Sequence, residues 1–221
     1  MNSKCWYKDV CTNQCISSCP RFIEMEFLFE NSGIPEGKRF LEKLDGTYDY
    51  DQYIRLQAIK DDILNFVNEG RNLYITSSNT GNGKTTWALK LLMKYFDEVW
   101  AGNGLRVRGL YVHVPRLLIE LKNFQSPLSE AYKKNLMDCD LVVWDDIAVS
   151  TVSTYDYSNL LMFLDARIMN NKSNIFTSNI LNPQDMSDVL GPRMASRVFN
   201  TSEIIIFKGK DRRHDTVASD K

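Results

Sequence analysis

A glycine-rich stretch at residues 78–86, with the sequence SNTGNGKTT, constrains the fold of this chain more than any other segment. An apolar run at 73–76 precedes it and an amphipathic run at 87–92 follows it, which is the order strand, loop, helix. Backbone N–H groups in such a loop, and at the start of the following helix, point toward a bound phosphate. The pattern therefore predicts that the chain binds a nucleoside triphosphate. The alternative is a chance glycine turn before a helix.

The residue types within this loop suit the chemistry of a phosphate site. Gly81 and Gly83 let the backbone curl around an anion without Cβ clashes. We expect Lys84 to reach the β- and γ-phosphates and the Thr85 hydroxyl to ligate Mg²⁺. Ser78 stands where the pattern is usually written with a glycine. The expected nucleotide-binding residues of the loop are Thr80, Gly81, Asn82, Gly83, Lys84, Thr85 and Thr86.

A second segment, LVVWDD at 141–146, predicts a buried strand that ends in two carboxylates. Ligands in open α/β sheets bind at the carboxyl ends of the strands, where the phosphate loop also lies. We expect Asp145 to hold Mg²⁺ and Asp146 to orient or deprotonate the attacking water. Aspartate is one methylene shorter than the glutamate that many ATPases use there, which predicts slow or partner-stimulated hydrolysis. An Asp-Asp helix cap is the alternative.

Polar residues further along the chain are candidates for nucleotide sensing. Asn179 ends the next apolar run, and its amide could contact the γ-phosphate or its water. Arg193 and Arg197 lie four residues apart on a helix that starts at Pro192, and so share one face. An arginine presented in this way can reach the γ-phosphate of a neighbouring subunit. The alternatives are an ordinary turn for Asn179 and solvated helix arginines.

Four of the five cysteines fall within the first nineteen residues, at Cys5, Cys11, Cys15 and Cys19. Four thiolates are the right number for a tetrahedral structural zinc site, and so short a segment has little core of its own. An iron–sulfur cluster, or cysteines that are unliganded or form disulfides, are the alternatives. Pro20 predicts the start of a helix that runs to about Glu30. We expect this segment to hold a protein-binding surface.

Bulk properties predict a soluble globular protein with one main domain and a small appendage. The formal net charge is −1, which excludes a bulk electrostatic attraction to DNA or to a membrane. No apolar stretch is long enough to span a bilayer, and residues 1–5 lack a signal-peptide core. We therefore expect no membrane association and a cytoplasmic location, where thiols stay reduced.

The remaining pattern predicts an α/β fold. Helical periodicity covers about 50–68, and short apolar runs at 110–114, 141–144, 174–177 and 203–207 alternate with helical segments. Such alternation predicts a parallel sheet between helices. The predicted organisation is a cysteine-rich metal-binding segment and helix at 1–31, a linker at 32–49, a nucleotide-binding domain at 50–213 and a polar tail at 214–221.

The order of these motifs resembles that of the DnaC/DnaI-type bacterial helicase loaders. It is most similar to short phage-encoded DnaC-like ATP-binding replication proteins. The motifs are GNGKT, VVWDD, TSN, GPRxxxR and GKDRR, and the resemblance covers about 32–213. It implies an AAA+ P-loop ATPase domain that hydrolyses ATP to ADP and phosphate. It also implies that Asn179 is the first sensor, Arg197 the arginine finger with Arg193 beside it, and Arg213 the final sensor arginine.

Members of that family assemble with ATP, bind single-stranded DNA and deliver a hexameric replicative helicase. The resemblance therefore implies these partners, self-association in the ATP state and, for a phage-encoded chain, the bacterial host cytosol. Three other functions stay open. They are a non-catalytic ATP-bound adaptor or inhibitor of a helicase, a transposase-helper ATPase of the same architecture, and a small nucleoside kinase.

Contact with single-stranded DNA has its own candidates around the second predicted strand. They are Arg106, Arg108, Arg116 and Lys122, with the aromatic residues Tyr111 and Phe124 and with His113 nearby. Basic groups interleaved with aromatic rings suit phosphate pairing and base stacking. The alternative is a solvated helix face over core aromatics.

Overall fold

A five-stranded parallel sheet is the centre of the computed structural model, which describes residues 4–12, 16, 18–42, 44, 47–122, 130–148 and 153–211. The strands are β1 (Asn72–Thr76), β2 (Gly109–His113), β3 (Leu141–Asp145), β4 (Ser173–Ser178) and β5 (Ser202–Ile206). Their order is β2-β3-β4-β1-β5, and every neighbouring pair is parallel. The parallel sheet predicted from the alternating apolar runs is confirmed.

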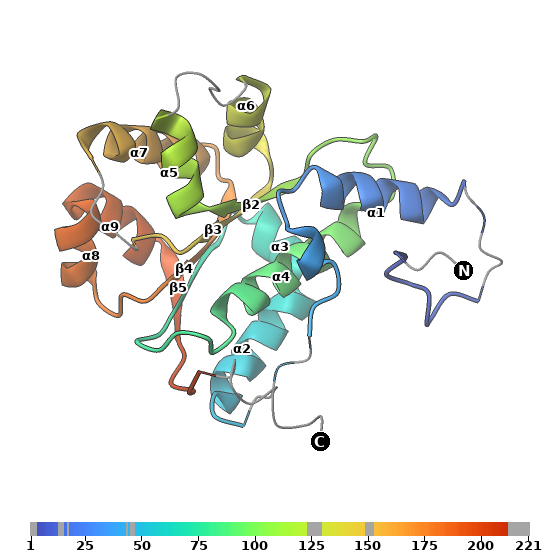
Figure 1. Ribbon diagram of the computed structural model, residues 1–221, viewed down its shortest axis with the longest axis horizontal. Coiled ribbons are helices and arrows are strands. Elements are labelled where there is room, and N and C mark those ends of the chain that lie inside the picture. Colours follow the sequence, from blue (N-terminus) through green and yellow to red (C-terminus); the bar gives the residue numbers. More distant parts are fainter. Residues whose placement is uncertain are drawn as a thin grey trace.

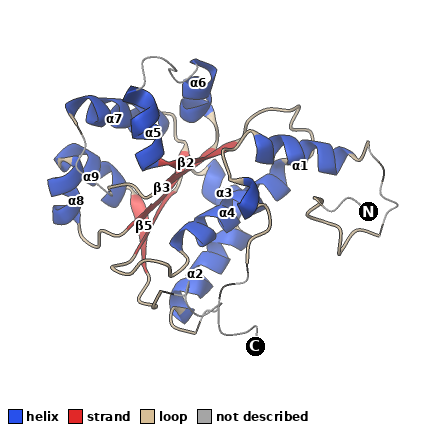
Figure 2. Ribbon diagram, in the orientation of Figure 1, coloured by secondary structure: helices blue, strands red, loops and turns tan. Residues whose placement is uncertain are grey.

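Helices cover both faces of this sheet (Figure 1). One layer holds α1 (Pro20–Glu30), α2 (Tyr50–Asp61), α3 (Ile63–Asn68) and α4 (Lys84–Val99). The other holds α5 (Val114–Lys122), α6 (Glu130–Asp138), α7 (Thr154–Met169), α8 (Pro183–Leu190) and α9 (Pro192–Phe199). Successive residues of β1 face alternate layers, since Leu73 and Ile75 join one hydrophobic core and Tyr74 joins the other. Figure 2 shows the strands enclosed between the two helical layers.

The strand register brings the predicted site residues to one edge of the sheet. Thr76, the last residue of β1, pairs with Ser178 of β4, and His113 of β2 pairs with Asp145 of β3. Because the strands are parallel, their carboxyl ends meet at this edge, and the loop that follows β1 leads from it into α4. The fold therefore places the phosphate loop beside the end of β3.

Two helix predictions have different outcomes. The helix expected from Pro20 to about Glu30 is confirmed as α1. The single helix expected over 50–68 is wrong, because Asp62 separates α2 from α3. Asp62 adopts φ −112° and its carboxylate accepts a hydrogen bond of 2.6 Å from the Asn65 side chain. With ψ at 29°, Asp62 lies outside the helical region, and aspartate is a weak helix former.

The segment before the nucleotide-binding domain packs on the same core as the domain. Met25, Leu28 and Phe29 of α1 are buried in the hydrophobic cluster that contains α4. The Tyr7 hydroxyl donates a 2.5 Å hydrogen bond to Asp97, near the end of α4. The predicted division at residues 31 and 49 stays a prediction, but the described residues before position 50 share a core with those after it. Among the described residues, no helix is long and apolar enough to cross a membrane.

A short strap at residues 32–34 runs along the outer side of β2, which is an edge strand of the sheet. The backbone N–H of Tyr111 donates a 2.7 Å hydrogen bond to the carbonyl oxygen of Ser32. Gly33 has φ +78°, and a Cβ there would lie 2.7 Å from the carbonyl oxygen of Tyr111. Glycine is therefore required for the strap to lie this close to the strand. The strap covers hydrogen-bonding groups that an edge strand otherwise exposes.

Candidate nucleotide-binding site

The loop between β1 and α4 has the backbone conformation that an anion site requires. Gly81 and Gly83 have φ +68° and +98°, and Gly83 directly precedes the first residue of α4. A Cβ at Gly83 would meet the side chain of Leu44 at 3.0 Å. Both glycines occupy left-handed conformations that residues with a side chain adopt at a cost. The N-terminus of α4 and its N–H groups follow directly, as phosphate binding requires.

Lys84 is held across the loop by polar groups of the loop itself. The lysine is 7% exposed, and its Nζ donates to the Asn79 carbonyl oxygen at 2.8 Å and to Asn82 Oδ1 at 3.3 Å. The buried Asn82 side chain in turn donates to Ser77 Oγ at 2.5 Å. These contacts place the ammonium group inside the curve of the loop, where it is available to a phosphate.

Asp145 is the most heavily bonded carboxylate at this edge of the sheet. It is 3% exposed and lies at the end of β3. Its Oδ1 accepts hydrogen bonds from the hydroxyls of Thr85 and Thr177, each at 2.7 Å. Its Oδ2 accepts a hydrogen bond of 2.7 Å from the hydroxyl of Tyr111. Residues from α4, β4 and β2 thus hold this carboxylate beside the hydroxyl that is expected to ligate a metal.

Asp146 follows in a conformation that few residues other than glycine adopt. Its φ is +55°, and its backbone N–H donates to Thr177 Oγ1 at 3.0 Å. His113 Nε2 lies 3.7 Å from Asp146 Oδ2. Burial, followed by the neighbouring charge of Asp145, raises the pKa of Asp146 above its ordinary value. A carboxylate with a raised pKa is a better proton acceptor, which suits the role predicted for it.

The donor set at this edge fits a divalent cation bound with a nucleotide. One ligand atom from each of His113, Asp145 and Asp146 lies within 4.8 Å of the other two. The described part of the chain contains no other group of three histidine, cysteine, aspartate or glutamate side chains this close together. Hydroxyl and carboxylate oxygens are the ligands that Mg²⁺ prefers, and Mg²⁺ usually keeps several waters beside them. Thr85 and Asp145 are therefore the residues that could hold Mg²⁺ here.

Sequence reasoning missed three contributors to this site. The sequence places Tyr111 and His113 only among the candidates for DNA contact, with a core position as the alternative for the tyrosine. Thr177 enters only as part of the TSN motif that contains the candidate Asn179. The missing signal was strand register. β2 and β4 flank β3, so residues in the later part of each flanking strand lie close to the end of β3. Asn179 itself is exposed and directly follows β4.

The two candidate finger arginines both contact one acidic residue of α7. Arg197 forms an ion pair through its Nε with Asp165, and Arg193 Nη2 lies 3.8 Å from the same carboxylate. Both arginines lie on α9, so the predicted shared helix face is confirmed. Their roles toward a nucleotide stay predictions. Arg213, the predicted final sensor, lies outside the described residues.

The cysteines do not form a metal site among the described residues. Cys5, Cys11 and Cys19 carry free thiols and belong to no cluster of three ligand atoms in the part of the chain that the structure describes. Cys15, the fourth predicted ligand, lies outside that part. The predicted zinc site therefore stays a prediction.

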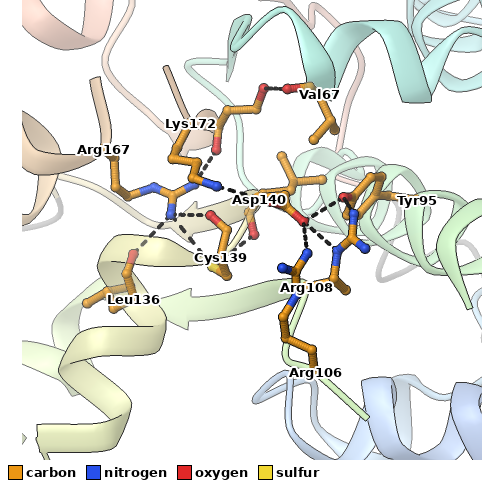
Figure 3. A network of polar contacts seen from close by, with 11 residues as sticks. Val67, Tyr95, Arg106, Arg108, Leu136, Cys139, Asp140, Arg167 and Lys172 are labelled. Carbon is orange, nitrogen blue, oxygen red and sulfur yellow. Dashed lines mark hydrogen bonds and ion pairs between the residues drawn. The ribbon is translucent and has the colours of Figure 1, made fainter. Parts of the chain in front are cut away.

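The basic residues predicted to contact DNA all have acidic partners within the chain. Arg106 and Arg108 both pair with Asp140, whose carboxylate also contacts Lys172 and Tyr95 (Figure 3). Arg116 pairs with Glu120 at 2.7 Å and Lys122 with Asp156 at 2.7 Å. Phe124 lies outside the described residues. These contacts give the cations structural roles, and DNA contact by this set stays a prediction.

Comparison with solved structures identifies the fold. The DnaC helicase loader has a TM-score of 0.63 at 20% identity, and the match covers 76% of this chain and 94% of that chain. For DnaI the TM-score is 0.62 at 22% identity, with 85% and 93% covered. The chain has the AAA+ fold of these loaders. Its sheet order, with β1 between β4 and β5, is typical of AAA+ domains.

The same AAA+ fold also matches a replication initiator. DnaA bound to AMPPCP and single-stranded DNA has a TM-score of 0.56 at 14% identity, and the match covers 78% of this chain and 49% of that chain. No family model matches the sequence, and no curated protein does. At these identities the likeness concerns the fold, and the chemistry rests on the residues described above.

Proposed function

We propose that this chain is an ATPase that loads a hexameric replicative helicase onto single-stranded DNA. The observation that carries the ATPase part is the cluster at the end of β3, where Thr85 and Asp145 share a hydrogen bond beside the phosphate loop. The likeness of the fold to two helicase loaders over most of the chain supports the loader part.

Each residue of the site has a role in this proposal. Lys84 and the N–H groups at the start of α4 bind the phosphates. Thr85 and Asp145 would hold Mg²⁺, which when bound would neutralise charge on the phosphate oxygens. Asp146 orients the attacking water and accepts its proton. Asn179, beyond β4, contacts the γ-phosphate or this water. Arg213, in the segment after β5, adds a positive charge near the phosphates.

Assembly in the ATP state is the second part of the proposal. Arg197 acts as an arginine finger on the nucleotide of a neighbouring subunit, with Arg193 beside it. Within the chain Arg197 pairs with Asp165, so its engagement in an assembly requires release from this carboxylate. This exchange gives one reason for turnover to depend on partners.

The N-terminal segment provides the partner surface in this proposal. Zinc held by Cys5, Cys11, Cys15 and Cys19 would fix a surface for the helicase, because a short segment without a core of its own gains stability from a metal. The packing of Tyr7 and α1 against α4 attaches that surface rigidly to the ATPase domain.

Size-exclusion chromatography with light scattering tests the proposal. The chain is mixed with hexameric replicative helicases from candidate bacterial hosts in the presence of ATP analogue, ADP or no nucleotide. We expect a nucleotide-dependent complex that Lys84→Ala abolishes. The control variant Lys133→Ala, on the exposed side of α6 where Lys133 pairs with Glu130, should retain it. Absence of a complex with every helicase in every nucleotide state would overturn the loader proposal and favour the transposase-helper function.

A second function is favoured by one residue. Asp146 stands where a longer glutamate is usual, which fits an adaptor or inhibitor that uses ATP as a structural ligand. Asp146→Asn separates the two, because it keeps the size of the side chain and removes the proton acceptor. A loader with this change forms the complex with helicase but loses ATP turnover and delivery. An adaptor keeps its effect on the helicase unchanged.

A further inference from the structure

Tyr111 connects two parts of the molecule that are far apart in sequence. Through its backbone N–H it donates to the carbonyl oxygen of Ser32 in the strap, at 2.7 Å. Through its hydroxyl it donates to Asp145 Oδ2, also at 2.7 Å. One residue of the edge strand β2 therefore contacts both the N-terminal part of the chain and the carboxylate expected to hold Mg²⁺.

The contact of the Tyr111 hydroxyl with Asp145 Oδ2 is not duplicated by other groups in the described residues. Thr85 and Thr177 both donate to the other oxygen, Oδ1. In the described part of the chain, the Tyr111 hydroxyl alone donates to Oδ2. Two donors on one oxygen leave the carboxylate free to pivot about that oxygen, whereas a third donor on the second oxygen fixes its plane. The orientation of this metal-binding carboxylate thus depends on β2.

The Tyr111 hydroxyl is suited to be a permanent donor. A tyrosine phenol is protonated at neutral pH, because its ordinary pKa is about 10. The phenol therefore stays protonated, and a carboxylate can only accept from it. A hydrogen bond to an ionised acceptor is stronger than a neutral one, so this contact holds both partners firmly.

We propose that Tyr111 is a positioning residue that sets the Mg²⁺ affinity of the nucleotide site, and that the strap at 32–34 controls it through β2. The inference rests on the proposed function, because it requires that Asp145 holds Mg²⁺. Groups that orient a metal ligand from behind contribute about 10- to 100-fold to metal affinity in characterised sites. Contacts made by the N-terminal segment would thereby change the Mg²⁺ affinity of the nucleotide site.

Affinity for a fluorescent ATP analogue, measured over a range of Mg²⁺ concentrations and in EDTA, tests the first link. Tyr111→Phe should raise the Mg²⁺ concentration for half-maximal effect by about tenfold. Its affinity in EDTA should stay within about twofold of the unmodified chain, because Lys84 and the loop bind the phosphates without Asp145. The matched control is Tyr95→Phe, which removes a 2.9 Å hydrogen bond from a tyrosine to Asp140, outside this site. This control should change neither quantity.

Gly33→Ala tests the second link. A Cβ at this position would lie 2.7 Å from the Tyr111 carbonyl oxygen, and the positive φ adds strain, so the strap must shift away from β2. We expect about a threefold rise in the Mg²⁺ requirement of the otherwise unmodified chain, and no further rise in the Tyr111→Phe background. Such non-additivity marks two changes that act through one contact.

The outcomes separate the inference from the function on which it rests. If Mg²⁺ does not strengthen nucleotide binding by the unmodified chain, the proposed site fails. If Mg²⁺ does, but Tyr111→Phe has an unchanged Mg²⁺ requirement or loses affinity equally in EDTA, the positioning role is overturned. Full additivity of Gly33→Ala and Tyr111→Phe overturns the link to the strap. Should Tyr111→Phe fail to fold, an unchanged Mg²⁺ requirement in Gly33→Ala alone overturns the inference.

Discussion

Replacing Thr177 with valine removes one hydroxyl that serves two site residues at once. The hydroxyl donates to Asp145 Oδ1 at 2.7 Å and accepts from the Asp146 N–H at 3.0 Å. Valine keeps the branched shape, so packing in β4 changes little, but the Asp146 N–H loses its partner. An unsatisfied buried donor costs about 1–3 kcal/mol, and one lost hydrogen bond about 1 kcal/mol. Asp145 keeps its other two donors, so we expect a total loss of about 2–4 kcal/mol in the free energy of unfolding.

The effect on catalysis should exceed the effect on binding. The Thr177 hydroxyl holds the backbone of Asp146, whose φ of +55° relaxes once that hydrogen bond is lost. We expect ATP turnover to fall by more than tenfold, which corresponds to about 1.4 kcal/mol in the barrier. Nucleotide affinity in EDTA should stay within about twofold, because the phosphate loop is unchanged.

Thr76→Val is the matched control for this prediction. Thr76 is equally buried on the neighbouring strand β1, but its hydroxyl donates to the carbonyl oxygens of Ile180 and Ser178 and not to Asp145. Urea unfolding and steady-state ATP hydrolysis are measured for both variants. We expect a loss of about 1 kcal/mol in stability for Thr76→Val, with turnover almost unchanged. Equal turnover in the two variants would refute the reasoning that Thr177 positions Asp146.

Three further predictions concern other parts of the molecule. Arg167 is fully buried and donates to the carbonyl oxygens of Leu136, Cys139 and Ser173; Figure 3 shows the first two contacts. Arg167→Met should therefore lower the free energy of unfolding, measured in urea, by about 3 kcal/mol. A loss below about 1 kcal/mol would contradict this prediction. Asp165→Asn should release Arg197 and raise the ATPase rate per chain at high protein concentration; a rate independent of concentration in this variant and in the unmodified chain would argue against a finger acting between subunits. Metal analysis of the purified chain should find about one zinc, which Cys19→Ser removes; a metal-free chain with intact helicase binding would exclude the predicted zinc site.

Local sequence pattern was sufficient to predict the architecture. The phosphate loop, the apolar runs and the proline at position 20 each act over a few residues, and they led to the parallel sheet, to the start of α4 and to the bounds of α1. Asp145 was predictable because it ends a buried strand. The break at Asp62 was not predictable from periodicity, since a single residue leaves the helical conformation within an otherwise helical pattern.

Contacts between strands were the part that sequence could not supply. Tyr111 and Thr177 approach Asp145 only because β2 and β4 flank β3 in this register, and strand order is a property of the whole sheet. The basic residues near β2 illustrate the reverse case. Their positive charge suggests DNA contact, but two of these residues pair with carboxylates that are distant in sequence. Arg108 pairs with Asp140, and Lys122 pairs with Asp156. Pairing of this kind becomes visible only in three dimensions.

Titration of ATP into the chain by calorimetry, with Mg²⁺ and in EDTA, tests the central claim most directly. The account predicts that the chain binds one nucleotide and that Mg²⁺ strengthens this binding. Lys84→Ala should abolish binding, and Asp145→Ala should remove the strengthening by Mg²⁺. Nucleotide binding that is unaffected by either substitution, or no binding by the unmodified chain at millimolar ATP, would contradict it.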